Sequence, residues 1–153
     1  MLEVGAVAPE IALRDGAGNT VRPLEGPRGP VLLVFFKVSC PTCQFTFPFL
    51  KRLADGAPGL RVVPVSQDRA AGTEAFVRQF VPGMPVWFDA PWAYAASTAF
   101  GIHHVPSLFL VEEDGRISQA GYGFSRGDLT ELGARFGLEV FRESERVPEF
   151  QPG

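Results

Sequence analysis

The sequence predicts an α/β fold with a mixed central β-sheet, helices on both faces and a β-hairpin extension at its N-terminal side. Three observations predict it. Residues 31–36 are apolar at every position, which is typical of a central strand covered on both faces. Strand-like and helical segments then alternate, and such βαβ units indicate parallel strands. A turn at Glu113–Arg116 separates two late strand-like segments, which adds an antiparallel pair.

The first half of the chain begins with the short hairpin, in which residues 10–13 and 20–24 flank a turn. Glycine and proline make residues 26–30 a rigid loop. A helix follows Cys40; Pro48 should kink it, and it ends by residues 56–59. The next strand is expected at residues 60–66, although its proline makes a smooth central strand less certain there.

The second half continues the alternation. Thr73 begins a helix that Pro82 stops. A short strand, a short helix, two strands joined by the turn and a last helix then follow, at residues 86–89, 92–100, 105–111, 117–122 and 128–136. Gly137 stops the last helix. We therefore expect one domain at 1–138 and a tail at 139–153, polar and proline-bearing from Arg142 onward, for which no element is assigned.

Composition excludes several classes of protein. The formal net charge is −3 and the basic residues are scattered, which argues against a nucleic-acid partner. No apolar run is long enough to cross a bilayer, so we expect no membrane partner. The N-terminal residues show no basic region followed by an apolar stretch. The expected location is therefore cytoplasmic, or periplasmic if a leader has been removed.

The chemistry centres on Cys40 and Cys43, the two cysteines of the chain, at the junction of a strand and a helix. Two thiols at this spacing can close and reopen a disulfide and so exchange electrons with other thiols. Free N–H groups and the helix dipole favour a thiolate at Cys40, and Pro41 fits the first helical turn. Cys40 is then the expected nucleophile and Cys43 the resolving thiol.

The two cysteines allow two other interpretations. Cysteines also pack in cores as small hydrophobic residues. A zinc site would need two further ligands, and His103 and His104 are the two histidines of the chain. Neighbours on an extended segment point to opposite faces, which makes them a poor pair for one metal ion. The pattern therefore favours a redox pair, with no metal or organic cofactor implied.

Several motifs occur in one order along the chain. They are Gly5-x-x-Ala8-Pro9-x-Ile11-x-Leu13-x-Asp15 with Gly18, Phe35-Phe36 before Cys40-Pro41-Thr42-Cys43 with Pro48, Phe88-Asp89, Val105-Pro106-Ser107, Asp114-Gly115-Arg116 and Gly121-x-Gly123. In this order they resemble the thioredoxin superfamily, in the branch of TlpA-like thiol-disulfide oxidoreductases and their redoxin and peroxiredoxin relatives. The resemblance implies a thioredoxin-like fold and a cis peptide bond at Pro106. The Val105 backbone would then face the cysteines and pair with an extended substrate.

The chain departs from that family at three positions. Ser39 stands where a Trp usually precedes the first cysteine. Val34 and Thr46 stand where relatives carry an acidic residue near the buried thiol. The usual internal proton acceptor is therefore not evident.

Besides Pro41, three residues near the cysteines are candidate modulators of the site. Lys37 lies three residues before Cys40, where its cation would favour the thiolate if the side chain turns toward the sulfur. Thr42 lies between the two cysteines. His104 precedes Val105 and could shuttle a proton at the rim of the site.

The leading functional hypothesis is a thiol-disulfide oxidoreductase that acts on protein or low-molecular-weight disulfides. A thiol peroxidase is the alternative, because Cys40-Pro41-Thr42 resembles the peroxidatic Cys-Pro-Thr of peroxiredoxins. Those enzymes carry a hydroxyl residue three positions before the cysteine, where this chain has Lys37. A non-enzymatic, redox-sensing redoxin module is a third possibility. The oligomeric state is not predicted.

Overall fold

The computed structural model describes residues 1–26, 29–89 and 93–153. The described strands are β1 (Leu13–Arg14), β2 (Thr20–Val21), β3 (Val31–Phe36), β4 (Arg61–Ser66), β5 (Trp87–Phe88), β6 (Ser107–Val111), β7 (Ile117–Tyr122), β8 (Phe124–Ser125) and β9 (Phe150–Gln151). The helices are α1 (Pro41–Gly56), α2 (Ala70–Phe80), α3 (Ala95–Ala99) and α4 (Arg126–Arg135).

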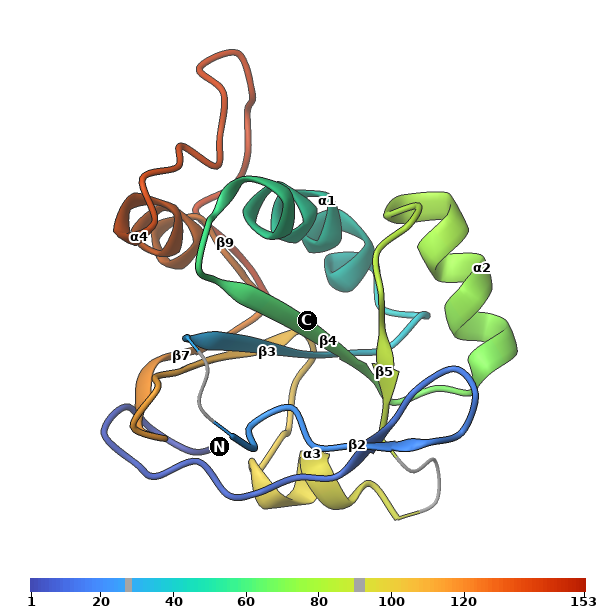
Figure 1. Ribbon diagram of the computed structural model, residues 1–153. Coiled ribbons are helices and arrows are strands. Elements are labelled where there is room, and N and C mark those ends of the chain that lie inside the picture. Colours follow the sequence, from blue (N-terminus) through green and yellow to red (C-terminus); the bar gives the residue numbers. More distant parts are fainter. Residues whose placement is uncertain (27–28, 90–92) are drawn as a thin grey trace.

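Seven of these strands form one mixed sheet in the order β2-β1-β5-β4-β3-β6-β7, and β8 and β9 form a separate pair (Figure 1). The β3–β4 and β4–β5 pairs are parallel, whereas β1–β2, β1–β5, β3–β6 and β6–β7 are antiparallel. The mixed sheet, the N-terminal hairpin β1–β2 and the late hairpin β6–β7 confirm the predicted fold class.

Strand β3 occupies the centre of the sheet with the bounds predicted, and all six of its residues are buried. Its neighbour β4 accommodates Pro64, which lies opposite Val34. On its other side β4 pairs with β5 only at Val65 and Ser66. Pro64 is therefore at a local edge of the sheet, where a missing backbone donor costs little.

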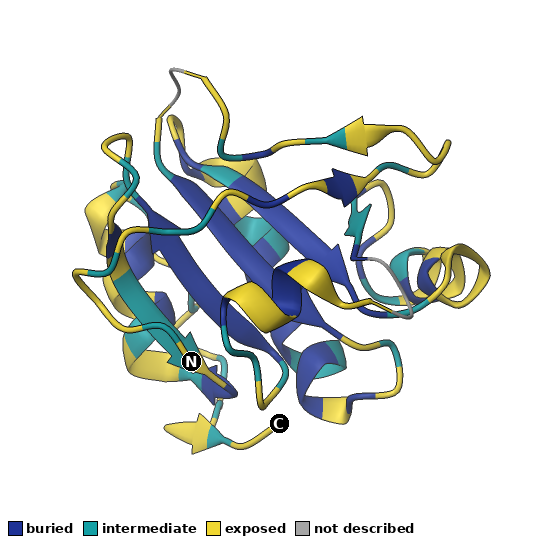
Figure 2. Ribbon diagram, turned by 90° about the horizontal axis from the view of Figure 1, so that it is seen from below, coloured by how far each residue is buried: buried dark blue, intermediate teal, exposed yellow. Residues whose placement is uncertain are grey.

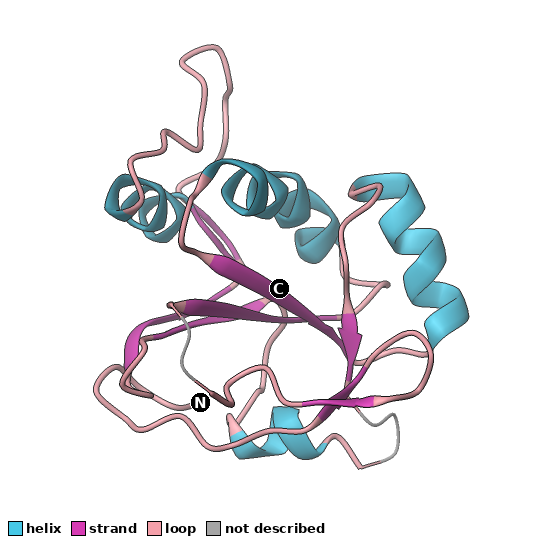
Figure 3. Ribbon diagram, in the orientation of Figure 1, coloured by secondary structure: helices cyan, strands magenta, loops and turns pink. Residues whose placement is uncertain are grey.

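The two faces of β3 build two hydrophobic clusters. Leu32, Val34 and Phe36 pack with residues of α1, α2 and α4, and the alternating positions pack with α3 and the N-terminal segment. Figure 3 shows α1, α2 and α4 above the sheet and α3 below it. Figure 2, seen from below, shows the buried central strands behind α3. Helices thus cover both faces, as expected for alternating β and α segments.

Two helix starts, those of α2 and α4, lie earlier in the chain than predicted. Helix α2 begins at Ala70, three residues before the expected Thr73. Thr73 is buried inside the helix, where its hydroxyl hydrogen-bonds to Ser66 Oγ (2.7 Å) and donates to the Arg69 carbonyl (2.9 Å). A threonine that satisfies its hydroxyl in this way does not need to cap a terminus.

The other helices match in type; α1 also begins and ends where predicted, whereas α3 and α4 have shifted bounds. Helix α4 begins at Arg126, where Ser125 Oγ accepts a hydrogen bond from the Asp128 N–H (3.2 Å). Helix α3 is shorter than predicted, and the expected start at Trp92 lies outside the described residues, as does part of the loop at 26–30. Helix α1 runs through Pro48, and the kink there stays a prediction.

The segment after α4 packs back onto the body. Val140 is buried within the cluster that contains α1. Arg52 of α1 donates to both carboxylate oxygens of Glu145, at 2.6 and 2.7 Å. In Figure 1 this segment (red) leaves the body as a loop and returns to place β9 beside β8. The division into a domain at 1–138 and a tail at 139–153 stays a prediction.

Within the described residues, no helix combines the length and the apolar character needed to cross a membrane.

Candidate active site

Cys40 lies at the N-terminus of α1, after the short loop at 37–39 that follows β3. It is the N-cap residue, with an extended backbone (φ −87°, ψ 111°), and Pro41 lies in the first helical turn, as predicted. The Cys43 N–H donates to the Cys40 sulfur at 3.1 Å. A sulfur that accepts from a free N–H at a helix start is in the position that stabilises a thiolate.

The loop before β6 forms the other side of the site. The Val105–Pro106 peptide bond is cis, the form that the resemblance implied. The Cys40 thiol donates to the Val105 carbonyl oxygen, with a sulfur–oxygen distance of 3.4 Å. Strand pairing explains this contact, because Phe35 near the end of β3 lies opposite Ser107 at the start of β6.

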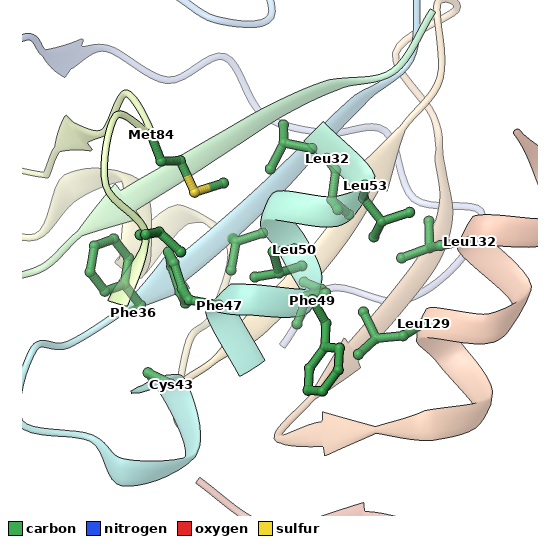
Figure 4. Close-up of a cluster of buried hydrophobic side chains, with 14 of the residues drawn as sticks. Leu32, Phe36, Cys43, Phe47, Phe49, Leu50, Leu53, Met84, Leu129 and Leu132 are labelled. Carbon is green, nitrogen blue, oxygen red and sulfur yellow. The ribbon is translucent and has the colours of Figure 1, made fainter. Parts of the chain in front are cut away.

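Cys43 is the buried partner of the pair. Its side chain is 0% exposed, and Figure 4 shows it at one end of the cluster of large apolar side chains. Burial raises the pKa of the Cys43 thiol, and the hydrogen bond with the Cys40 side chain and the negative charge of Asp68 raise it further. A backbone hydrogen bond from Lys37 acts in the opposite direction. Cys43 is therefore a protonated thiol at neutral pH.

Asp68 is a residue of the site that the sequence analysis missed. Its Oδ2 accepts a hydrogen bond of 2.7 Å from the Val38 N–H, two residues before Cys40. The sequence did contain a signal for this contact, because it predicted two parallel strands that end near Phe36 and Ser66. The structure pairs these two residues in register. The residues that follow two such strands meet at one edge of the sheet.

The predicted modulators take different places around the pair. Lys37 is exposed, and its carbonyl accepts from the Cys40 N–H at 3.3 Å. His104 is exposed and stacks on Tyr122, with ring centroids 5.0 Å apart. A role of either side chain in the chemistry stays a prediction. His103 is also exposed.

Thr42 is buried and faces the segment around β9. Its hydroxyl donates to the Pro152 carbonyl at 2.6 Å and accepts from Gln151 Nε2 at 3.0 Å. The sequence predicts no element at residues 151 and 152, so their contact with Thr42 comes from the structure alone.

Across residues 1–26, 29–89 and 93–153, no group of three or more His, Cys, Asp or Glu side chains is arranged to hold a metal ion. Both cysteines are free thiols in this structure, so the geometry is that of the reduced pair.

The sheet, its covering helices and the dithiol at a helix start define a thioredoxin-like protein. This fold matches the crystal structure described as the thiol:disulfide interchange protein DsbE of Chlorobium tepidum, with a TM-score of 0.75 and 26% identity, covering 88% of this chain and 96% of that one. Within that class, the chain belongs to the Redoxin family, whose family model matches residues 3–135.

Two curated relatives carry the comparison further. Methylamine utilization protein MauD of Methylorubrum extorquens is 30% identical over 135 residues, covering 85% of this chain and 62% of that protein. Thiol-disulfide oxidoreductase ResA of Bacillus thuringiensis is 23% identical over 121 residues, covering 77% of this chain and 69% of that protein. The chain thus spans less than two thirds of the length of the MauD relative.

Proposed function

We propose that this chain is a thiol-disulfide oxidoreductase that exchanges the Cys40–Cys43 dithiol with the disulfide of a protein or of a small molecule. The observation that carries the proposal is the placement of the Cys40 sulfur, between the Cys43 N–H and the Val105 carbonyl at the first turn of α1. Membership of the Redoxin family and the names of the ResA and DsbE relatives support it.

In the reductive direction, the Cys40 thiolate attacks one sulfur of the substrate disulfide. The substrate S–S bond breaks, a bond between Cys40 and the substrate forms, and the departing thiolate takes up a proton. Cys43 then loses its proton and attacks the Cys40 sulfur, which releases the second substrate thiol. Two electrons and two protons have moved to the substrate, and the chain holds a Cys40–Cys43 disulfide.

The different surroundings of the two thiols support this order of events. Cys40 is 9% exposed and meets an incoming disulfide first, whereas Cys43 is enclosed and protonated. Its thiolate is needed only in the second step. In this proposal Val105 and Pro106 bind the substrate backbone, no metal or organic cofactor takes part, and the same steps in reverse oxidise a substrate dithiol.

The experiment compares reduction of insulin disulfides by the native chain, by Cys40→Ser and by Cys43→Ser, with an exposed loop variant, Ser144→Ala, as the control. We expect the native chain and the control to be active. Cys40→Ser should lose all activity, and Cys43→Ser should trap the substrate as a mixed disulfide. Full activity in Cys40→Ser would refute the proposal.

Peroxide distinguishes the alternative functions. A thiol peroxidase would oxidise the Cys40 thiolate to a sulfenate and release water within a stopped-flow time course. We expect slow oxidation, because Lys37 replaces the hydroxyl residue that peroxiredoxins carry three positions before the reactive cysteine.

A redox-sensing module would instead bind partners in one oxidation state without turnover. The redox midpoint of the pair, set against a compartment's poise, would give the direction of electron flow.

A further inference from the structure

The chain segment at residues 149–153 lies against the candidate active site. Strand β9 pairs antiparallel with β8, which places Gln151 opposite Phe124 and Phe150 opposite Ser125. The Arg126 N–H donates to the Glu149 carbonyl at 3.0 Å, which extends the pairing by one bond. This pairing directs the residues that follow β9 toward the N-terminus of α1.

Two glycines allow the segment to approach closely. At Gly123, which precedes β8, a Cβ would lie 2.6 Å from the Gln151 carbonyl oxygen. At Gly153, a Cβ would overlap the Val105 carbonyl oxygen. Only residues without side chains at these two positions are compatible with the observed path.

The segment also bonds to the residue between the two cysteines. The Thr42 hydroxyl donates to the Pro152 carbonyl and accepts from the Gln151 side-chain amide. A short stretch of backbone therefore lies in contact both with Thr42 and with Val105, whose carbonyl also accepts from the Cys40 thiol. An extended substrate that pairs with Val105 needs this same space.

We propose that residues 150–153 are a built-in competitor that occupies the substrate-binding face beside Cys40 and must leave before a protein disulfide can bind. The inference rests on the proposed function, because it assigns a regulator to that same site. The apparent affinity for the substrate then equals the intrinsic affinity multiplied by the fraction of molecules in which the segment is displaced. Only small reagents would reach Cys40 while the segment is in place.

The contacts that keep residues 150–153 in place are weak enough to allow reversible release. The pairing with β8 involves two residues of β9, and Phe150 is 47% exposed despite its edge-to-face contact with Tyr122. Short ladders with exposed side chains are marginal by themselves. The ion pair between Arg52 and Glu145 anchors the chain further back, so that release of residues 150–153 need not detach the whole tail.

The test compares the native chain with a deletion of residues 148–153 and with Gly153→Ala. In Gly153→Ala the added methyl group cannot share the space of the Val105 carbonyl, so the segment must move. The matched control is Gly16→Ala, at a position where a Cβ meets nothing within 4 Å. Circular dichroism and thermal unfolding establish that each variant is folded.

Two rates are measured for each protein: alkylation of Cys40 by a bulky maleimide, followed by mass spectrometry, and reduction of insulin. We expect the deletion and Gly153→Ala to raise both rates at least about fivefold, the lower end of common coupling strengths. A synthetic peptide with the sequence of residues 147–153, added to the deletion variant, should slow alkylation again.

The outcomes separate this inference from the proposed function. Equal alkylation rates in the native chain and in both folded variants would overturn the inference, whatever the turnover. The variants could instead be alkylated faster than the native chain while neither they nor the native chain reduce insulin. That result would support the competing role of residues 150–153 and contradict the proposed oxidoreductase function. If only the deletion variant misfolds, Gly153→Ala decides alone.

Discussion

Asp68 acts on the Cys40–Cys43 segment through both a hydrogen bond and a charge, and two substitutions separate the two effects. Asp68→Asn keeps an oxygen that can accept from the Val38 N–H, now at 2.7 Å from Oδ2, but removes the charge. Asp68→Ala removes both. Because the charge of Asp68 raises the pKa of Cys43, both variants should make the Cys43 thiolate easier to form.

The expected magnitudes follow from the type of bond. Hydrogen bonds to charged groups contribute about 1.5–3 kcal/mol and neutral ones about 0.5–1.5 kcal/mol. Asp68→Asn should therefore lower the free energy of unfolding by about 1 kcal/mol, and Asp68→Ala by about 2 kcal/mol. The two variants should shift the titration of Cys43 downward by similar amounts, because both lack the same charge.

The assay follows the ultraviolet absorbance of the Cys43 thiolate against pH in a Cys40→Ser background, together with denaturant unfolding of each variant. The matched control is Asp55→Asn, which removes a carboxylate that pairs with Lys51 near the far end of α1. An Asp68→Asn titration that coincides with the Asp55→Asn titration would refute the electrostatic part of the reasoning. Equal stability of Asp68→Asn and Asp68→Ala would refute the hydrogen-bond part.

Three further predictions concern stability. Phe47 is 0% exposed, so Phe47→Ala should cost about 3–5 kcal/mol in denaturant unfolding; a loss below about 1 kcal/mol would contradict the packing described. The bidentate hydrogen bond from Arg52 lowers the pKa of Glu145 to about 2 from 4.5. The pair of Arg52 and ionised Glu145 therefore stabilises the fold above pH 4.5, and this stabilisation disappears as pH falls toward 2. The difference in Tm between native and Glu145→Gln proteins should vanish over that range. Ser125→Ala removes the cap of α4 and should cost about 1 kcal/mol, whereas Ser125→Asp should retain the stability.

Local patterns predicted the parts of the fold that local physics determines. The apolar run at 31–36 gave the bounds of β3, because a strand between two others must be apolar on both faces. Pro41 after Cys40 predicted the start of α1, because the first helical turn is where a proline costs least. The dithiol at the helix start followed from the same motif, whereas the place of the Val105 loop beside it was implied by the family resemblance.

The position of the tail depends on contacts that no local pattern contains. Residues 139–153 show no hydrophobic periodicity, and β9 has only two residues, too few for a recognisable alternation. Its place is decided by β8 and Thr42, about 25 and 110 residues earlier in the chain. The apolar side chains that anchor the tail, Val140 and Phe141, form too short a stretch to show a periodicity.

The acidic group near the buried thiol, Asp68, lies at a different position from those at which the family resemblance led us to expect one. Val34 and Thr46 are the positions at which the family resemblance led us to expect a carboxylate, and both are buried without charge. The Gln67 N–H donates to the Phe36 carbonyl at 3.0 Å, so the chain leaving β4 stays beside the chain leaving β3 for at least one more residue. Asp68 comes next, and it therefore reaches the segment before Cys40 across the sheet rather than along the sequence. Burial is the main cause of the raised pKa of Cys43, and the charge of Asp68 adds to it from position 68 rather than from 34 or 46.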